Sequence, residues 1–278
     1  MDLEALKAIK PLYMAYSACR LLRFRVNLAV AKLHDRKDRR NPAYVPLPPA
    51  ELRHRVHGSL DPVSFLQVGR AVAQNLHDLC TSVGRDIYSF QNVLDFGCGC
   101  GRVLRNFQDA PESCRLYGTD IDPGLVSWCE ENLPRVRCST NGFQPPLPYA
   151  DKTFDLIYAI SVFTHLDEQP QQAWLKELHR VARPGAILIL SVHGEPLIQG
   201  LSPSLRSRVR SHGFLFVKRA TGRLKLDKLP DSYQHSFQTR EYIFREWSTY
   251  FDVVRYIERG INSTQDAVLL RQRVTEAA

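Results

Sequence analysis

Hydrophobic positions along the chain follow two periodicities, one typical of strands and one typical of helices. Short strand-like runs occur at 93–96, 115–120, 135–138, 154–160, 186–192, 251–257 and 265–270. Apolar residues at helical spacing occur at 3–34, 62–81, 168–182 and 241–250, and a further helix is expected to open at 103–107. Strands that alternate with helices predict an α/β fold built on a doubly wound, mostly parallel sheet.

Two segments depart from this alternation. Residues 1–60 form a basic helical extension followed by a charged run at 34–40 and a proline-rich linker, and 61–278 contain the strands. Residues from about 194 to 240 lack clear periodicity, and we expect them to form an insertion that serves as a substrate lid, with a solvated insertion as the alternative. The helix over 3–34 leaves two alternatives. It lies on an anionic membrane surface, or it packs on the domain or on a second subunit.

The distribution of charged residues along the chain argues about which partners the protein binds. The net charge is +8, and ten Lys and Arg against four acids give residues 1–40 a charge of +6. A nucleic-acid enzyme spreads basic residues around its cleft, so this distribution argues against a nucleic-acid substrate. Hydrophobic residues make up 44% of the chain, which is ample for a core.

The seven cysteines give no metal-binding spacing and no disulfide framework. We therefore expect free thiols and no bound metal. Free thiols indicate a cytoplasmic protein, and peripheral contact with a membrane is an option. The start of the chain, Met-Asp-Leu-Glu, does not resemble a signal peptide. No apolar stretch reaches the roughly 18–20 residues of a membrane-spanning helix.

The most informative stretch is the turn after the first predicted strand, which has glycine at every second position. Asp95 precedes Gly97, Gly99 and Gly101. Side-chain-free residues permit a sharp bend that passes close to a ligand. The dinucleotide fingerprint requires glycine at its sixth position, and Arg102 or Leu104 occupies that position in either register. An ordinary tight turn is the alternative.

A second acid ends the next predicted strand. In Gly-Thr-Asp-Ile-Asp-Pro, Asp120 lies 23 residues beyond Gly97, near the spacing of about 20 residues at which an acid binds a ribose. A carboxylate accepts hydrogen bonds from both sugar hydroxyls. Asp122 is expected to cap the helix that opens at Pro123.

These two motifs resemble those of the class I S-adenosylmethionine-dependent methyltransferases, and the similarity covers roughly 62–272 apart from the insertion. The resemblance implies a seven-stranded sheet with a terminal antiparallel hairpin and S-adenosylmethionine as cofactor. It places Asp95 near the amino-acid end of the donor, often through water, and the glycines where they make room for the donor. It makes Asp120 the ribose ligand.

The same resemblance assigns the adenine side of the donor site. Many family members have an aspartate four residues before a Leu-Pro pair, but here Phe143 occupies that position, and Asn141 and Gly142 precede it. An Asn141 amide and a Phe143 stacking face are the expected substitutes. Ile121 and Ser161 complete the cofactor set that the resemblance implies.

The chemistry of a methyl donor indicates what the other residues must do. A sulfonium methyl group is already electrophilic, so the protein aligns the acceptor and accepts a proton where one is released. His165, after the fourth strand, and His193, after the fifth, are the candidate bases because a histidine titrates near neutrality. For His165 the alternative is a role in capping or packing the next helix.

The function expected is methyl transfer to a small-molecule or glycan- or lipid-linked acceptor on oxygen. The chain contains neither an Asn-Pro-Pro-Tyr sequence nor a Pro-Cys sequence, which argues against the DNA-methylating subgroups. Two alternatives stay open. One is a protein that binds S-adenosylmethionine without turnover, as a scaffold or membrane-surface partner, and the other is a nicotinamide-dependent oxidoreductase.

Overall fold

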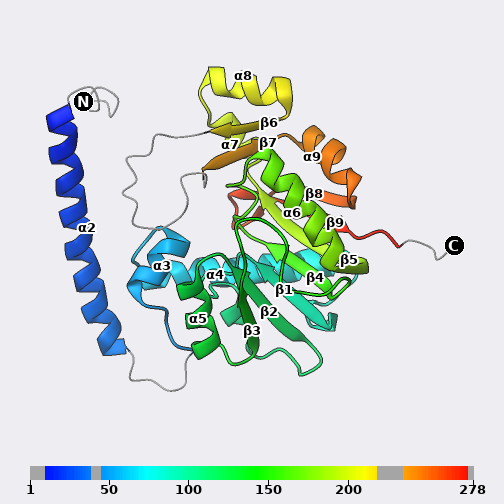
Figure 1. The fold of residues 1–278 in the computed structure, drawn as a ribbon, viewed down its shortest axis with the longest axis horizontal. Helices are drawn as coiled ribbons and strands as arrows, with labels where there is room; N and C mark the ends of the chain where they lie inside the picture. The colour runs from blue at the N-terminus through cyan, green and yellow to red at the C-terminus, as the bar shows by residue number, and fades with distance from the viewer. Residues whose placement is uncertain (1–9, 39–44, 218–233, 275–278) are drawn as a thin grey trace. The chain divides into compact units, whose positions relative to one another are not determined.

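The structure is a computed structural model that describes residues 10–38, 45–217 and 234–274 (Figure 1). The chain divides into two compact units. One comprises Met1–Phe65 with Ala220–Pro230, and the other comprises Leu66–Arg219 with Asp231–Ala278. The larger unit contains every strand described below.

A seven-stranded sheet in the order β3-β2-β1-β4-β5-β9-β8 forms the centre of the larger unit. Its strands are β1 (Asn92–Phe96), β2 (Arg115–Asp120), β3 (Val136–Thr140), β4 (Phe154–Ala159), β5 (Ala182–Val192), β8 (Asp252–Ile261) and β9 (Gln265–Arg271). The first five strands are parallel, and β9 runs antiparallel to both β5 and β8. The doubly wound sheet with a terminal antiparallel hairpin is therefore confirmed.

The strand order reverses between β1 and β4, which pair through residues such as Leu94 and Ile157. In open α/β sheets, ligands bind outside the carboxyl ends of the strands at such a switch point. The bend after β1 and the loop after β4 both lie at this edge. The topology thus brings the glycine motif and the His165 segment to one place.

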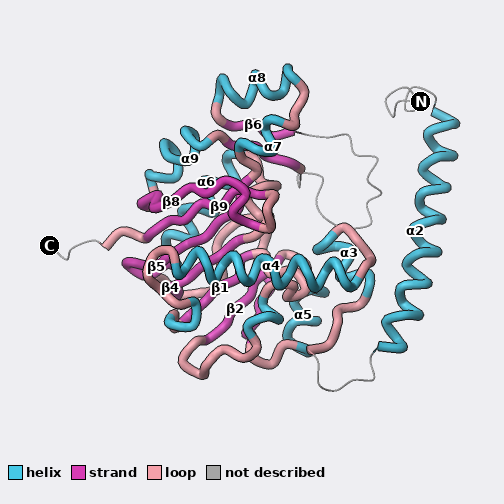
Figure 2. The backbone as a smooth tube through the Cα atoms, turned by 180° about the vertical axis from the view of Figure 1, so that it is seen from behind, coloured by secondary structure: helices cyan, strands magenta, loops and turns pink. Residues whose placement is uncertain are grey.

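Helices cover both faces of this sheet. Two of them, α4 (Pro62–Thr81) and α6 (Glu168–Val181), lie on opposite faces, as the two opposite views show (Figures 1 and 2). On the α6 face, Trp174 and Leu178 pack with Trp247 and with Leu188 of β5 in one buried cluster. The remaining helical elements here are η1 (Ile87–Ser89), α5 (Pro123–Asn132), α9 (Arg240–Glu246) and η3 (Trp247–Thr249).

The prediction that a helix follows the glycine bend is wrong. Only a single 3₁₀ turn, η2 (Leu104–Phe107), follows it. Leu104 and Phe107 are buried, so their apolar spacing reflects packing of the turn against the core. A 3₁₀ segment of this length lacks the aligned peptide dipoles of an α-helix. The segment that follows the bend therefore adds no α-helix dipole to a ligand site there.

The insertion after β5 is more regular than its sequence suggests. It contains α7 (Glu195–Gln199), α8 (Pro203–His212) and the two-stranded antiparallel sheet of β6 (Phe214–Val217) and β7 (His235–Gln238). Gly213 ends α8 with a φ of 78°, which explains a glycine at that position. Residues 218–233 lie outside the described residues.

In the smaller unit, helix α2 (Lys10–Asp38) runs through most of the segment expected to be a charged linker run. A second helix, α3 (Ala50–His57), lies where the sequence predicts only linker, and Gly58 ends it with a φ of 72°. Arg53 is fully buried and donates to both carboxylate oxygens of Asp35 at 3.0 and 3.1 Å. None of the described helices is long and apolar enough to cross a membrane.

The interior strand β5 should contribute strongly to the stability of the larger unit. Leu188 is fully buried, so Leu188→Ala leaves a cavity and is expected to lower the free energy of unfolding by about 2–5 kcal/mol. Leu197 on α7 is 36% exposed, and Leu197→Ala should cost far less. Urea unfolding of both variants measures the difference, and equal losses would contradict this view of the core.

Candidate active site

The glycine bend is fixed to the neighbouring strand by its own backbone. The N–H groups of Gly97 and Cys98 both donate to the Thr119 carbonyl, at 2.8 and 2.9 Å. Gly97, Gly99 and Gly101 have φ values of 82°, 57° and 68°, a region that glycine adopts without strain. The alternating glycines are thus required by backbone conformation.

Two of these glycines also lack space for a side chain. A Cβ on Gly97 would lie 2.3 Å from Cγ2 of Val162, and one on Gly101 would lie 2.3 Å from Cδ1 of Leu133. The bend therefore packs directly against the loop after β4 and against the residue that ends α5.

Asp120 lies at the end of β2 with its carboxylate turned to the bend. Its Oδ2 accepts from the Gly99 N–H at 2.9 Å, and its Oδ1 accepts from the Asp122 N–H at 2.9 Å. Burial raises the pKa of this carboxyl group, and the backbone hydrogen bonds oppose that shift. A carboxylate has about four acceptor sites, so capacity remains for sugar hydroxyls.

Asp95 lies inside β1 and is only 2% exposed. It stands opposite Tyr158 of β4 in the sheet. Burial raises the pKa of Asp95 well above its usual range, and the nearby Asp120 carboxylate adds to that effect. This burial is consistent with an indirect contact to a donor rather than with a direct one.

The expected adenine-side residues follow β3. Asn141 is buried, and both ends of its amide are engaged. Its Oδ1 accepts from the Thr119 hydroxyl at 2.6 Å, and its Nδ2 donates to the Gly142 carbonyl at 2.8 Å. Gly142 is exposed, Phe143 is half-buried, and Ile121 beside Asp120 is half-buried. The Asn141 amide therefore braces β2 and the loop, and Phe143 presents the more accessible surface.

Ser161, just beyond β4, has a φ of 61°, which is rare for a residue with a side chain. Its N–H donates to the Ser191 hydroxyl at 2.7 Å, and its hydroxyl accepts from Nε2 of Gln265 at 2.8 Å. The Oε1 of Gln265 is buried without a hydrogen-bond partner among the described residues. Strain and an unsatisfied buried acceptor are features of ligand sites.

Three histidines gather beside this network. The ring centroid of His165 lies 6.0 Å from that of His193 and 5.2 Å from that of His235, and the last two rings are 5.7 Å apart. They come from the loop after β4, the residue after β5 and the start of β7. The structure thus brings together the two predicted bases and a third histidine.

The orientation of two of these rings is fixed by backbone carbonyls. Nδ1 of His165 lies 2.6 Å from the Gln234 carbonyl, and Nδ1 of His193 lies 3.2 Å from the Ser236 carbonyl. A carbonyl only accepts, so each Nδ1 carries the proton, and in the neutral ring Nε2 is the proton acceptor. Burial, aided by the nearby His235, lowers the pKa of His193 to about 4.

The antiparallel hairpin supplies a group that the sequence patterns did not single out. Asp266 on β9 is fully buried. Its carboxylate accepts from the Tyr256 hydroxyl at 2.6 Å and from the N–H groups of Glu195 and Arg259 at 3.1 and 2.8 Å. Asp266 thereby joins the start of the insertion to β8.

Gln265 and Asp266 were missed as site residues although their strand was predicted. The available signal was a polar pair that opens an otherwise apolar strand. Because β9 runs antiparallel to β5, its first residues lie beside the carboxyl end of β5. Asp122 and Asp167 cap α5 and α6, as Asp122 was expected to do.

The described residues fit the donor that the motifs imply. The bend has the backbone conformation of a ligand-binding loop, a carboxylate with spare acceptor capacity adjoins it, and the unpaired Oε1 of Gln265 lies beside the strained Ser161. These groups suit a nucleoside with sugar hydroxyls and a charged amino-acid end.

Comparison with known proteins agrees with this geometry. Residues 93–185 match the family model described as a methyltransferase domain. A malonyl-[acyl-carrier protein] O-methyltransferase from Hahella chejuensis is 29% identical over 104 residues, which are 36% of this chain and 36% of that protein. Methyltransferase GfsG from Streptomyces halstedii is 26% identical over 182 residues, 62% of this chain and 59% of that protein.

These curated relatives are thus matched over between about a third and three-fifths of their own length. Among solved structures, the 1,6-didemethyltoxoflavin-N1-methyltransferase of Burkholderia thailandensis, with S-adenosylhomocysteine bound, superimposes with a TM-score of 0.54 at 16% identity. The superposition covers 81% of this chain and 88% of that chain, and it supports the fold. Residues 93–185 therefore match a methyltransferase domain, and the larger unit has the fold of methyltransferases that use S-adenosylmethionine as cofactor.

Proposed function

We propose that this protein transfers the methyl group of S-adenosylmethionine to an oxygen of a small-molecule or glycan- or lipid-linked acceptor and releases S-adenosylhomocysteine. The observation that carries the proposal is one continuous edge of the sheet. The glycine bend and Asp120 lie at one end of it, and His165 and His193 follow the adjoining strands β4 and β5. Donor and acceptor functions thus meet at the topological switch point.

On the donor side, each residue has a distinct task. Asp120 accepts hydrogen bonds from the ribose hydroxyls, while its bond to the Gly99 N–H holds it in place. Ile121 and Phe143 pack against the adenine, with Gly142 giving room and Asn141 bracing the loop. Asp95 acts on the amino-acid end through water. When bound, the donor supplies a methyl group on a positively charged sulfur that reacts with a nucleophile directly.

On the acceptor side, His165 is the general base. Its Nδ1–H is held by the Gln234 carbonyl, so Nε2 is the atom that takes the hydroxyl proton. His193 stays uncharged at neutral pH because of its low pKa, and its Nε2 accepts a hydrogen bond that orients the acceptor. Ser161 fixes the loop between these rings and the donor.

The insertion is the proposed acceptor lid. In its described part, α7, α8, β6 and β7 form a small apolar core around Ile198, Val209 and Phe237. Phe237 also stacks beside His193, with ring centroids 5.4 Å apart. Oxygen as the accepting atom is supported by the histidine bases and by relatives named as O-methyltransferases, although other relatives are named for N- or C-methylation.

We propose in addition that α2 lies on an anionic membrane surface from the cytoplasmic side. Seven of the eleven exposed large hydrophobic side chains recorded for the described residues lie on this helix. Apolar residues recur at alternating spacings of three and four, at Leu12, Ala15, Cys19, Leu22, Val26, Ala29 and Leu33. This spacing places them along one face of the helix.

The charges beside that face favour lipid over a second copy of the helix. Arg23 and Arg25 are exposed at its borders. Self-pairing along this face would bring these like charges together, which is unfavourable. Anionic headgroups would instead neutralise them while the apolar face enters the interface. The seven free cysteines support a reducing cytoplasmic setting.

The first test separates an enzyme from a binding protein. Asp120→Ala should weaken S-adenosylhomocysteine binding by roughly 10- to 100-fold, since hydrogen bonds to a charged group contribute about 1.5–3 kcal/mol. Asp122→Ala, the matched control, removes a helix cap and should leave binding unchanged. Calorimetry measures both.

The paired activity measurement follows label from the methyl donor into extract metabolites. The wild type and Asp122→Ala should label the same product, and Asp120→Ala should not. Retained donor binding with no labelled product from any extract would favour the non-catalytic scaffold. Equal binding by Asp120→Ala would contradict the donor site itself.

The second prediction concerns pH and stability. Because the pKa of His193 is about 4 in the folded protein and about 6.5 when unfolded, the unfolded state binds more protons between these values. Wild-type stability should therefore fall, relative to His193→Gln, by on the order of 3 kcal/mol as pH drops from 6.5 to 4. His212→Gln on exposed α8 is the control, and a pH-independent difference would refute a buried neutral His193.

The third prediction tests α2. The full chain should float with vesicles of phosphatidylcholine and phosphatidylglycerol, but not with phosphatidylcholine alone, and added salt should release it. Val26→Asp should abolish flotation, whereas Val63→Asp, at a similarly exposed site outside α2, should not. Absence of flotation, with concentration-dependent dimer formation that Val26→Asp disrupts, would favour self-association.

A further inference from the structure

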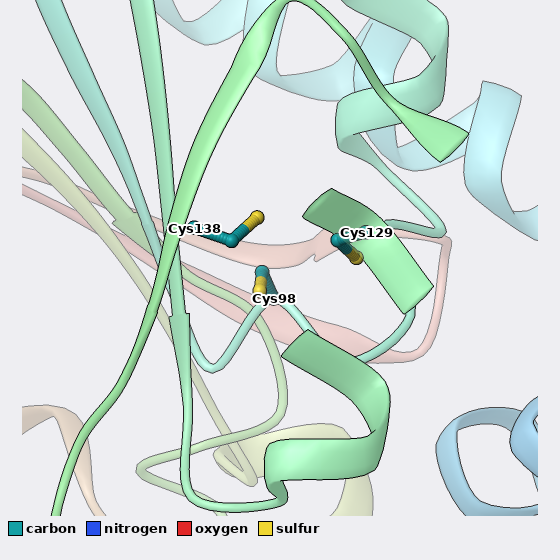
Figure 3. Close-up of side chains that lie close together, drawn as sticks. All are labelled: Cys98, Cys129 and Cys138. Atoms are coloured by element: carbon teal, nitrogen blue, oxygen red, sulfur yellow. The ribbon is translucent and has the colours of Figure 1, made fainter. Parts of the chain in front are cut away.

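Three cysteines from separate parts of the chain meet beneath the glycine bend. Cys98 belongs to the bend, Cys129 to α5 and Cys138 to β3 (Figure 3). Their three Sγ atoms all lie within 4.8 Å of one another. Sequence spacing gave no indication of this cluster, because 31 and 9 residues separate its members.

The cluster is largely buried and lies against the backbone of the bend and of β2. Cys98 is 4% exposed and Cys129 is fully buried, while Cys138 is half-buried. The thiols of Cys98 and Cys129 both lie 3.5 Å from the Gly99 carbonyl. Gly118 approaches so closely that a Cβ there would lie 2.9 Å from Sγ of Cys98.

Cysteine binds a metal ion as the thiolate, so each thiol of the cluster loses its proton when its sulfur binds a cation.

We propose that Cys98, Cys129 and Cys138 bind one thiophilic closed-shell cation, of the class of Cu⁺, Zn²⁺ or Cd²⁺. Soft sulfur ligands select such ions, and hard cations require oxygen ligands that this cluster does not offer. A metal–sulfur bond of about 2.3 Å places trigonal or tetrahedral sulfurs about 3.8–4.0 Å apart. The three Sγ atoms, all within 4.8 Å of one another, lie near that spacing.

Binding involves no change of oxidation state. Each thiol that still carries a proton releases it to buffer as its sulfur bonds the cation, and no electrons move. Because Cys98 lies between Gly97 and Gly99, the cation would fix the same bend that Asp120 contacts. The site goes beyond methyl transfer, since its ligands differ from those proposed for donor or acceptor.

The test uses Cd²⁺ as the probe on the reduced full chain. Ultraviolet thiolate-to-metal charge-transfer absorption should saturate at one equivalent, and native mass spectrometry should show one bound ion. Cys129→Ser and Cys138→Ser should each weaken binding by more than about 100-fold, since losing a ligand costs more than losing an outer-shell partner. The controls Cys114→Ser, buried elsewhere, and Cys19→Ser, exposed on α2, should bind as the wild type does.

A second readout guards against variants that fail to fold. Cd²⁺ should raise the melting temperature of the wild type and both controls, but not of Cys138→Ser, which changes a half-buried residue. S-adenosylhomocysteine should still bind Cys138→Ser, which separates this proposal from the proposed function. Unchanged Cd²⁺ affinity in Cys138→Ser and Cys129→Ser, or loss of binding in Cys19→Ser, would overturn the site.

Discussion

Two hydrogen bonds to a single carbonyl determine the position of the glycine bend, on which the candidate site depends. The N–H groups of Gly97 and Cys98 both reach the Thr119 carbonyl, so the chain must reverse direction as soon as β1 ends. That reversal sets the left-handed conformation of the glycines and turns the Gly99 N–H to Asp120. The same reversal brings Cys98 under the bend, within reach of Cys129 and Cys138.

Sequence reasoning recovered the features that local pattern controls. The seven strands of the main sheet and the Asp122 cap follow from apolar runs and helix-start residues, whereas β6 and β7 in the insertion were not predicted. It failed at the helix after the bend, because a buried 3₁₀ turn and a helix opening share the apolar spacing of Leu104 and Phe107. It missed α3 since the prolines before Ala50 indicated only linker.

Contacts between residues far apart in the sequence could not be predicted from the hydrophobic pattern. The cysteine cluster joins three elements, and the bond between Gln265 and Ser161 joins residues 104 positions apart. Asn141 illustrates the same limit in another way. Its amide suggested a ligand contact, but Thr119 and Gly142 already engage both of its ends. Residue type predicted the polarity of this loop and not the direction of its hydrogen bonds.

The antiparallel hairpin has a consequence for biosynthesis. Gln265 and Asp266, which brace Ser161 and the start of the insertion, belong to the last strand of the described chain. A nascent polypeptide that has already formed the five parallel strands therefore still lacks these braces until β9 has left the ribosome. The loops after β4 and β5 that carry His165 and His193 gain these braces only when β9 inserts between β5 and β8.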